Sequence, residues 1–203
     1  MSRPLAAASL LLLSSALAAI AGPAAAEFAL TILHVNDLHS RLEPISRFDG
    51  TCSAEDDAAG ECFGGVARLK TLIEARRAAA EAAGRAVLLL DAGDQFQGSL
   101  IYTTYKGAAA AEFMEALGVD AMAVGNHEFD DGPEGLAGFL DKVSFPVLAG
   151  NVDVSAEPAL AGRVGAWTIL EAGGARIGIV SALATDTVET SSPGPNLVFS
   201  DEV

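Results

Sequence analysis

Short apolar runs recur along the chain and are separated by polar loops. Residues 28–35 are rich in apolar and β-branched side chains, and residues 86–90 are apolar throughout. The first pattern predicts a strand, and the second is typical of a strand covered on both faces. Residues 119–124 and 145–148 predict two further strands.

Segments with helical spacing lie between these strands. Residues 65–83, 108–117 and 133–143 predict helices, and the last begins with a proline, which a first helical turn tolerates. Closer to the C-terminus, residues 167–170 and 176–180 flank two glycines and predict a hairpin. The repeated strand–loop–helix order favours an α/β fold with a mainly parallel sheet and an added hairpin.

Residues 1–26 have the composition of a secretory signal peptide. Arg3 precedes an apolar stretch at residues 5–20, and three alanines end the segment before Glu27. An uncleaved membrane anchor is the alternative, but the apolar run is short for a spanning helix. We therefore expect no stable membrane span and an exported protein, periplasmic or secreted. Residues 27–203 are enough for one domain with a substantial core.

The chain is strongly acidic, with 27 acidic and 12 basic side chains and a formal net charge of −15. This charge argues against nonspecific nucleic-acid binding, because no basic patch would displace the counterions of a phosphate backbone. A phosphate-bearing substrate is compatible with the charge if bound cations lie between the protein and the ligand.

A long polar loop is predicted from residue 37 to about residue 61, and it brings two cysteines close together in the sequence. In an exported protein, Cys52 and Cys62 are expected to form a disulfide, with free thiols or soft-metal ligands as the alternatives. The acidic residues 55–57 of the same segment are expected on a solvated face of the loop.

Three polar motifs each follow a predicted strand: Asn36–His39, Gly93–Gly98 and Gly125–Asp130. Open α/β sheets place their sites at the carboxyl ends of strands, so we expect the motifs to form one site. Taken singly, each has an ordinary explanation, namely a surface pair, a tight turn or a helix cap. Their occurrence in this order, each after an apolar run, favours the shared site.

Oxygen and imidazole ligands for divalent ions come from all three motifs. Asp37 and His39 are two residues apart and can point to the same side of a chain that leaves a strand. Asp94 could bridge two cations, and Asn126 offers a neutral amide oxygen. Such a mixed set suits Zn²⁺, Mn²⁺ or a similar ion better than a thiolate site does.

His127 directly follows Asn126, and adjacent residues do not easily bind the same ion. We therefore expect His127 to face a substrate, as a proton donor or a positive group, with Asp130 holding its other ring nitrogen. The implied reaction is hydrolysis of a phosphate ester by a metal-held hydroxide. His34 lies within the first predicted strand and is expected to be a structural histidine, whereas Glu128 and Asp131 are expected to be supporting or solvent-facing.

The three motifs resemble the signature of the 5′-nucleotidase family of calcineurin-like metallophosphoesterases. Further similar stretches make the resemblance cover nearly all residues after 26: residues 40–43, 62–69, 88–92 and 195–199. The resemblance implies the N-terminal part of a layered α/β/β/α sandwich. It also implies two divalent ions, Zn²⁺ or otherwise Mn²⁺, Co²⁺ or Mg²⁺, and extracytoplasmic nucleoside 5′-phosphates or related nucleotides as substrates.

The family pattern also implies a role for each matching residue. Four residues would hold the two ions, with the second aspartate as the bridge: Asp37, His39, Asp94 and Asn126. His127 and Asp130 would form a catalytic dyad that stabilises the transition state. Cys52 and Cys62 would form a loop disulfide.

The chain departs from the family pattern after His127, because no further histidine follows. The family has additional histidine ligands downstream, and a C-terminal domain whose aromatic side chains hold the nucleobase. We therefore expect residues 27–203 to be a truncated metallophosphoesterase domain with an incomplete second metal site, weakly active or inactive alone. A non-catalytic metal- or phosphate-binding remnant is the alternative. A half-built sheet is also expected to leave an exposed, aggregation-prone edge.

Overall fold

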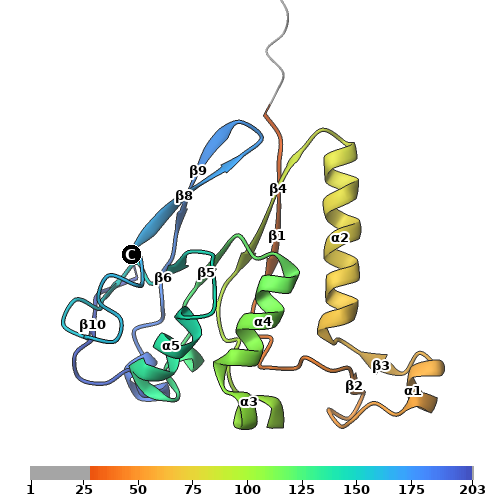
Figure 1. The fold of residues 1–203 in the computed structure, drawn as a ribbon, viewed down its shortest axis with the longest axis horizontal. Coiled ribbons are helices and arrows are strands. Elements are labelled where there is room, and N and C mark those ends of the chain that lie inside the picture. Colours follow the sequence, from red (N-terminus) through yellow and green to blue (C-terminus); the bar gives the residue numbers. More distant parts are fainter. Residues whose placement is uncertain (1–27, 203) are drawn as a thin grey trace, which may run out of the picture.

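A computed structural model describes residues 28–202 (Figure 1). The predicted signal peptide, residues 1–26, lies outside the described residues. At the centre is a parallel four-stranded sheet in the order β1-β4-β5-β6. Its strands are β1 (Leu30–Val35), β4 (Ala86–Asp91), β5 (Ala121–Ala123) and β6 (Val147–Leu148). All four predicted strands are confirmed, although β5 and β6 are shorter than the apolar runs that predicted them.

Three main helices connect the strands: α2 (Val66–Ala82), α4 (Gly107–Leu117) and α5 (Gly132–Leu140). The sheet grows in one direction along the chain, and right-handed crossovers then place every connecting helix on the same face. Accordingly, α4 packs between α2 and α5, as Figure 1 shows. Side chains between this helical layer and the sheet are almost fully buried, including Leu89, Met114, Met122 and Phe139.

The predicted hairpin is present as β8 (Trp167–Ala172) and β9 (Ala175–Val180). Its turn is Gly173–Gly174, and both residues have a positive φ, which glycine adopts without strain. The hairpin contacts β4 through β8, and β9 borders an apolar cavity of about 260 Å³ against the parallel sheet. The described residues therefore form a mixed α/β fold with a parallel sheet, as predicted.

The sequence pattern did not predict the short elements. They are β2 (Ile45–Ser46), α1 (Ala54–Ala58), β3 (Cys62–Phe63), α3 (Leu100–Tyr105), the 3-10 turn η1 (His127–Phe129), β7 (Val152–Asp153), α6 (Thr187–Thr190) and β10 (Val198–Phe199). Most have too few residues to show a periodicity, and tertiary contacts set their conformation. Over residues 28–202, no helix is long and apolar enough to cross a membrane.

The loop prediction was wrong for residues 55–57, which form the first turn of α1. The Ser53 hydroxyl accepts a hydrogen bond from the Asp56 N–H at 3.1 Å and caps this helix. Acidic side chains in a first turn are also favoured by the helix dipole. Glu55 and Asp57 remain exposed, so the solvated position of the run was predicted correctly.

The disulfide prediction is confirmed, since Cys52 and Cys62 are bonded with their Cα atoms 5.8 Å apart. This excludes the two alternatives, free thiols and soft-metal ligands. The bridge closes the segment that contains α1, and an ion pair between Asp57 and Arg68 joins the same segment to α2.

Candidate metal centre

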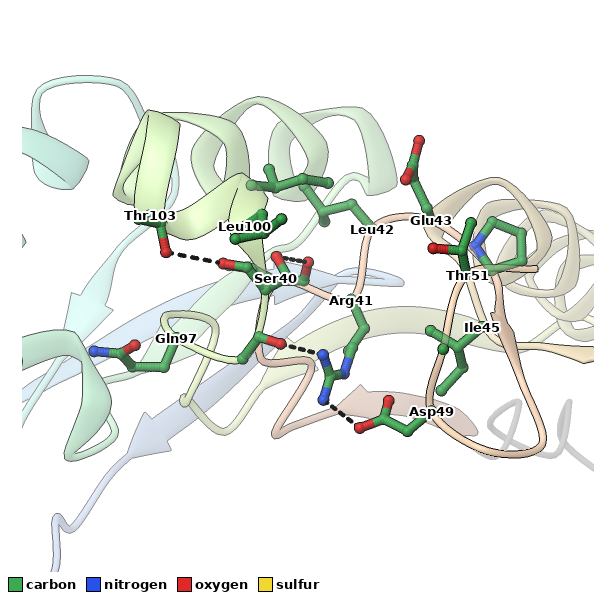
Figure 2. A pocket seen from close by; sticks show the side chains of 15 residues that line it. Ser40, Arg41, Leu42, Glu43, Ile45, Asp49, Thr51, Gln97, Leu100 and Thr103 are labelled. Carbon is green, nitrogen blue, oxygen red and sulfur yellow. Dashed lines mark hydrogen bonds and ion pairs between the residues drawn. The ribbon is translucent and has the colours of Figure 1, made fainter. Parts of the chain in front are cut away.

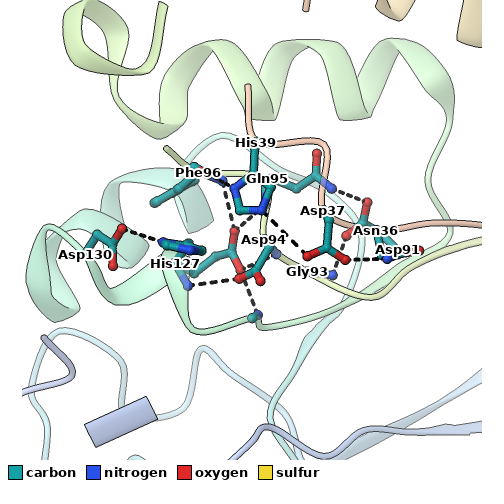
Figure 3. Close-up of polar contacts among 12 residues, drawn as sticks. Asn36, Asp37, His39, Asp91, Gly93, Asp94, Gln95, Phe96, His127 and Asp130 are labelled. Carbon is teal, nitrogen blue, oxygen red and sulfur yellow. Dashed lines mark hydrogen bonds and ion pairs between the residues drawn. The ribbon is translucent and has the colours of Figure 1, made fainter. Parts of the chain in front are cut away.

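The three polar motifs meet at the carboxyl end of the parallel sheet (Figure 3). The loops after β1 and β4 run side by side, because the Asp37 N–H donates to the Gly93 carbonyl and the His39 N–H to the Asp94 carbonyl, each at 3.0 Å. The third motif follows β5, which is the next strand of the sheet. The strand order thus brings together residues that are about ninety positions apart in the sequence.

Two glycines allow the second and third loops to touch. A Cβ atom on Gly93 would lie 2.4 Å from the backbone nitrogen of Gly125, and one on Gly125 would lie 2.3 Å from the Asp94 Oδ1. Both distances are shorter than any real Cβ contact. The glycines before Asp94 and Asn126 are therefore required by the close approach of the two loops.

His39, Asp94 and His127 form a group whose potential ligand atoms all lie within 4.8 Å of one another. The centroids of the two imidazole rings are 5.0 Å apart, and the rings meet edge to face. His39 Nδ1 donates to the Phe96 carbonyl at 3.2 Å, since a carbonyl can only accept, and this leaves Nε2 free as a ligand. Two imidazoles and a carboxylate are a donor set that divalent transition metals prefer.

The two remaining predicted ligands lie beside this group. The Asp37 Oδ1 is 3.6 Å from the His39 Nε2, and the Asp37 side chain is about half exposed. Asn126 is partly exposed and stands at the start of η1, directly before His127. All five residues therefore come from loops that border one another.

The backbone of the first two loops is strained. Asp37, His39 and Asp94 have φ values of 51°, 47° and 58°, which lie in the left-handed region that residues other than glycine rarely adopt. Each such residue costs on the order of 1 kcal/mol, and the surrounding hydrogen bonds must hold it in place. Strain of this kind clusters at functional sites and supports the assignment of these loops to one site.

His127 is held on two sides. Its N–H donates to the Asp94 Oδ1 at 3.0 Å, and its Nδ1 lies 2.7 Å from the Asp130 Oδ2. Burial lowers the pKa of His127, but the hydrogen bond and charge of Asp130, with the nearby acidic groups, raise it more, so the pKa stands above its usual value. The ring can face either a metal ion or a substrate through Nε2.

Glu128 is fully buried and ties the second loop to the third. Its Oε2 accepts from the N–H groups of Asp94 at 2.9 Å and Gly125 at 2.7 Å. Its Oε1 accepts from Gln95 at 2.8 Å and Phe96 at 3.3 Å. Burial raises the pKa of Glu128, and the backbone hydrogen bonds oppose that rise. The supporting role expected for Glu128 thus fits these contacts, whereas the solvent-facing alternative was wrong.

Asp91 holds the second loop in place, a role that the sequence pattern did not predict. Its carboxylate accepts from the Gly93 N–H and from the Gln95 side-chain amide, both at 2.7 Å. Burial raises its pKa to about 8 against the lowering effect of these hydrogen bonds. The only sequence signal was a carboxylate placed directly after the apolar run of residues 86–90, at the last position of β4.

Three further groups lie around the centre. Asp131 accepts from the Tyr102 hydroxyl at 2.6 Å, which holds its pKa below the usual range, and pairs with Lys106 at 3.1 Å. The Ser191 hydroxyl donates to the Asp130 Oδ1 at 2.6 Å. The two residues are 61 positions apart in the sequence, and no sequence signal indicated this contact. His34 is exposed on β1 and lines the cavity beneath the hairpin, outside the ligand group.

A larger cavity of about 600 Å³ opens beside the His39 loop (Figure 2). Residues directly after His39 form one wall, and Gln97 to Ile101 form another. Arg41 spans the cavity floor, where its guanidinium donates to the Gly98 carbonyl and to the Asp49 carboxylate.

The parallel sheet with a carboxylate–imidazole group at its strand ends defines an α/β domain with a candidate site for a divalent metal ion. A family model described as calcineurin-like phosphoesterase matches residues 30–201. The chain therefore belongs to the calcineurin-like phosphoesterase family.

The chain is also similar to individual proteins over part of their length. The chain is 48% identical to the 5′-nucleotidase of Diplobatis ommata, in an alignment that covers 88% of this chain and 30% of that protein. It is 46% identical to the human 5′-nucleotidase, in an alignment that covers 93% of this chain and 32% of that protein. The crystal structure of a 5′-nucleotidase precursor from Thermus thermophilus matches with a TM-score of 0.73 at 43% identity, over 86% of this chain and 32% of that one. The chain thus spans about a third of the length of these relatives.

Proposed function

We propose that this chain is the metal-binding part of a 5′-nucleotidase-type phosphohydrolase that acts on nucleoside 5′-phosphates or related nucleotides. The observation that carries the proposal is the convergence of His39, Asp94 and His127 within 4.8 Å at the strand ends. The similarity to 5′-nucleotidases supports the substrate class.

The proposed centre would hold two divalent ions, the second with an incomplete set of ligands. Asp37 and His39 would hold the first ion, Asp94 would bridge, and Asn126 would hold the second, with Zn²⁺ or Mn²⁺ suited to these ligands. Bound divalent ions make a water molecule nucleophilic at neutral pH and neutralise charge on a phosphoryl group.

His127 and Asp130 would act on the substrate side. The 2.7 Å contact keeps Nδ1 of His127 engaged with Asp130, so that Nε2 is the atom presented to the centre. A protonated Nε2 can donate a hydrogen bond to charge that develops on the phosphoryl group or on the leaving oxygen.

An exported location completes the proposal. The predicted signal peptide at residues 1–26 and the disulfide between Cys52 and Cys62 support it, because disulfides persist in oxidising compartments.

Metal binding by the full-length chain tests the proposal. Titration calorimetry with Zn²⁺ or Mn²⁺ should detect binding that is lost in Asp94→Ala and His39→Ala and retained in Asp186→Ala, an exposed control. Phosphate release from AMP, measured alongside, should be weak but detectable for the parent and abolished by Asp94→Ala. Equal metal binding by the parent and Asp94→Ala would refute the proposal.

A non-catalytic metal binder is the second candidate. It is favoured by the ligand group itself, because His39, Asp94 and His127 supply three side chains, enough to hold one ion. Binding of a single ion with no phosphate release at any metal concentration would favour this candidate over the hydrolase.

A further inference from the structure

Asp130 is held from two sides by residues that lie far apart in the sequence. One carboxylate oxygen, Oδ2, contacts the His127 Nδ1 at 2.7 Å. The other, Oδ1, accepts the hydroxyl hydrogen bond of Ser191 at 2.6 Å. Because both oxygens form hydrogen bonds, the plane of the carboxylate is fixed. The Asp130 side chain is only 13% exposed, so water has little access to replace either partner.

Ser191 stands on a segment whose position is fixed independently of the centre. It follows α6, and its N–H donates to the Thr187 carbonyl at 3.0 Å. Thr187 is fully buried, and its hydroxyl donates to the Ala184 carbonyl at 2.7 Å. Before α6, Asn151 binds both the N–H and the carbonyl of Leu183 at 2.8 Å. The hydroxyl of Ser191 therefore reaches Asp130 from a well-anchored backbone.

The segment after Ser191 is anchored as well. Pro193 is buried, and the Cα region of Gly194 packs near the Pro133 ring at the start of α5. Leu197 is buried in the core, and β10 pairs with β7. The segment is thus held at both ends, and the serine is a rigid reference point for the carboxylate.

We propose that Ser191 is a positioning residue for the His127–Asp130 pair: its hydroxyl fixes the Asp130 carboxylate, which in turn fixes the ring orientation of His127. The inference rests on the proposed function for its catalytic consequence, but the geometric claim stands on the two contacts to Asp130. Outer hydrogen-bond partners of this kind typically change activity by about ten- to a hundredfold when they are removed.

The variants separate positioning from a general structural effect. Ser191→Ala removes the hydroxyl, and Ser191→Thr keeps it on an extended backbone that suits a β-branched residue. Ser192→Ala is the matched control, because Ser192 is the adjacent, exposed serine. Ser191→Cys preserves the size of the side chain with a weak donor and should behave as the alanine variant does.

The first readout requires neither metal nor activity. The full-length chain has three histidines, so NMR spectra of isotope-labelled histidine can be assigned with a His127→Gln variant. We expect a sheltered Nδ1–H proton for His127 in the parent, the Thr variant and the Ser192 control. In the Ala and Cys variants that proton should exchange with water about tenfold faster. No change in the Ala variant relative to the control would overturn the proposal.

The second readout is turnover in the metal-loaded chain. Where the parent releases phosphate from AMP, Ser191→Ala should lower kcat about tenfold with KM within about twofold, and Ser191→Thr should restore kcat. A change in KM alone would overturn the positioning role. Absence of turnover in the parent at every metal concentration would count against the hydrolase, whereas the NMR comparison would still decide the role of Ser191.

Discussion

Glu128→Gln provides the sharpest test of how the centre is assembled. The native carboxylate accepts four backbone hydrogen bonds, two on each oxygen, and is fully buried. A glutamine side chain has nearly the same shape but presents one oxygen and one NH₂ group. Whichever way the amide is turned, two backbone N–H donors then face another donor.

The magnitude follows from the number of N–H groups left without an acceptor. Each buried, unsatisfied donor costs about 1–3 kcal/mol, so two of them should destabilise the protein by roughly 2–6 kcal/mol. For a chain of this size, 1 kcal/mol corresponds to a shift of about 2–4 °C in Tm. We therefore expect Tm to fall by at least about 4 °C at pH 7, together with a loss of metal affinity, because the bonds to Asp94 and Gly125 hold the two loops together.

Thermal unfolding followed by circular dichroism, with calorimetric metal titration, measures both effects. Glu112→Gln is the matched control, since Glu112 is exposed on α4 and the charge change is identical. If Glu128→Gln melts within 1 °C of this control, the carboxylate does not join the loops, and our account of the centre is wrong.

Three other changes test separate parts of the structure. Gly125→Ala should abolish calorimetric metal binding, because its Cβ would lie 2.3 Å from a candidate ligand oxygen; retained binding would contradict the close approach of the loops. Cys52→Ser should lower the unfolding free energy by about 2–3 kcal/mol in urea titrations, because the disulfide no longer closes a ten-residue loop. Excess reductant should lower the unfolding free energy of the parent to that of the variant and leave the variant unchanged. Tyr102→Phe should destabilise the protein by about 1 kcal/mol at pH 7. The hydrogen bond from Tyr102 lowers the pKa of Asp131 in the folded protein below the ordinary value of 3.8. The stability that this bond contributes is therefore present above pH 3.8 and is lost as the pH falls through the folded-state pKa. The difference in unfolding free energy between the parent and the variant should accordingly shrink below pH 3.8.

The strands followed from local pattern, and so did the meeting of three polar loops at one edge of the sheet. Residues 86–90 are apolar without interruption because β4 is a central strand of the sheet, and such a strand leaves a clear signal. Polar ligands directly after such runs are recognisable because parallel strands all deliver their carboxyl ends to one edge. The same reasoning worked for the hairpin, where two glycines mark the turn.

The supporting contacts were not predictable in this way. Glu128 looks like any acidic residue of a polar loop, and only the structure shows that it accepts hydrogen bonds from residues 33 positions away. The sequence pattern predicts a loop for the acidic run after Ser53, but in the structure this serine caps a short helix. A five-residue helix shows too little periodicity to be distinguished from a turn.

The sequence by itself determined the class of fold and showed that three polar loops with candidate ligands follow neighbouring strands, because burial and strand order produce a regular pattern of apolar and polar residues. The tertiary structure alone decided which groups hold those ligands in place: Glu128 between two loops, Asp91 beneath one, and Ser191 against Asp130. These contacts join residues of distant segments through single hydrogen bonds, and a single hydrogen bond imposes no periodic pattern on either segment.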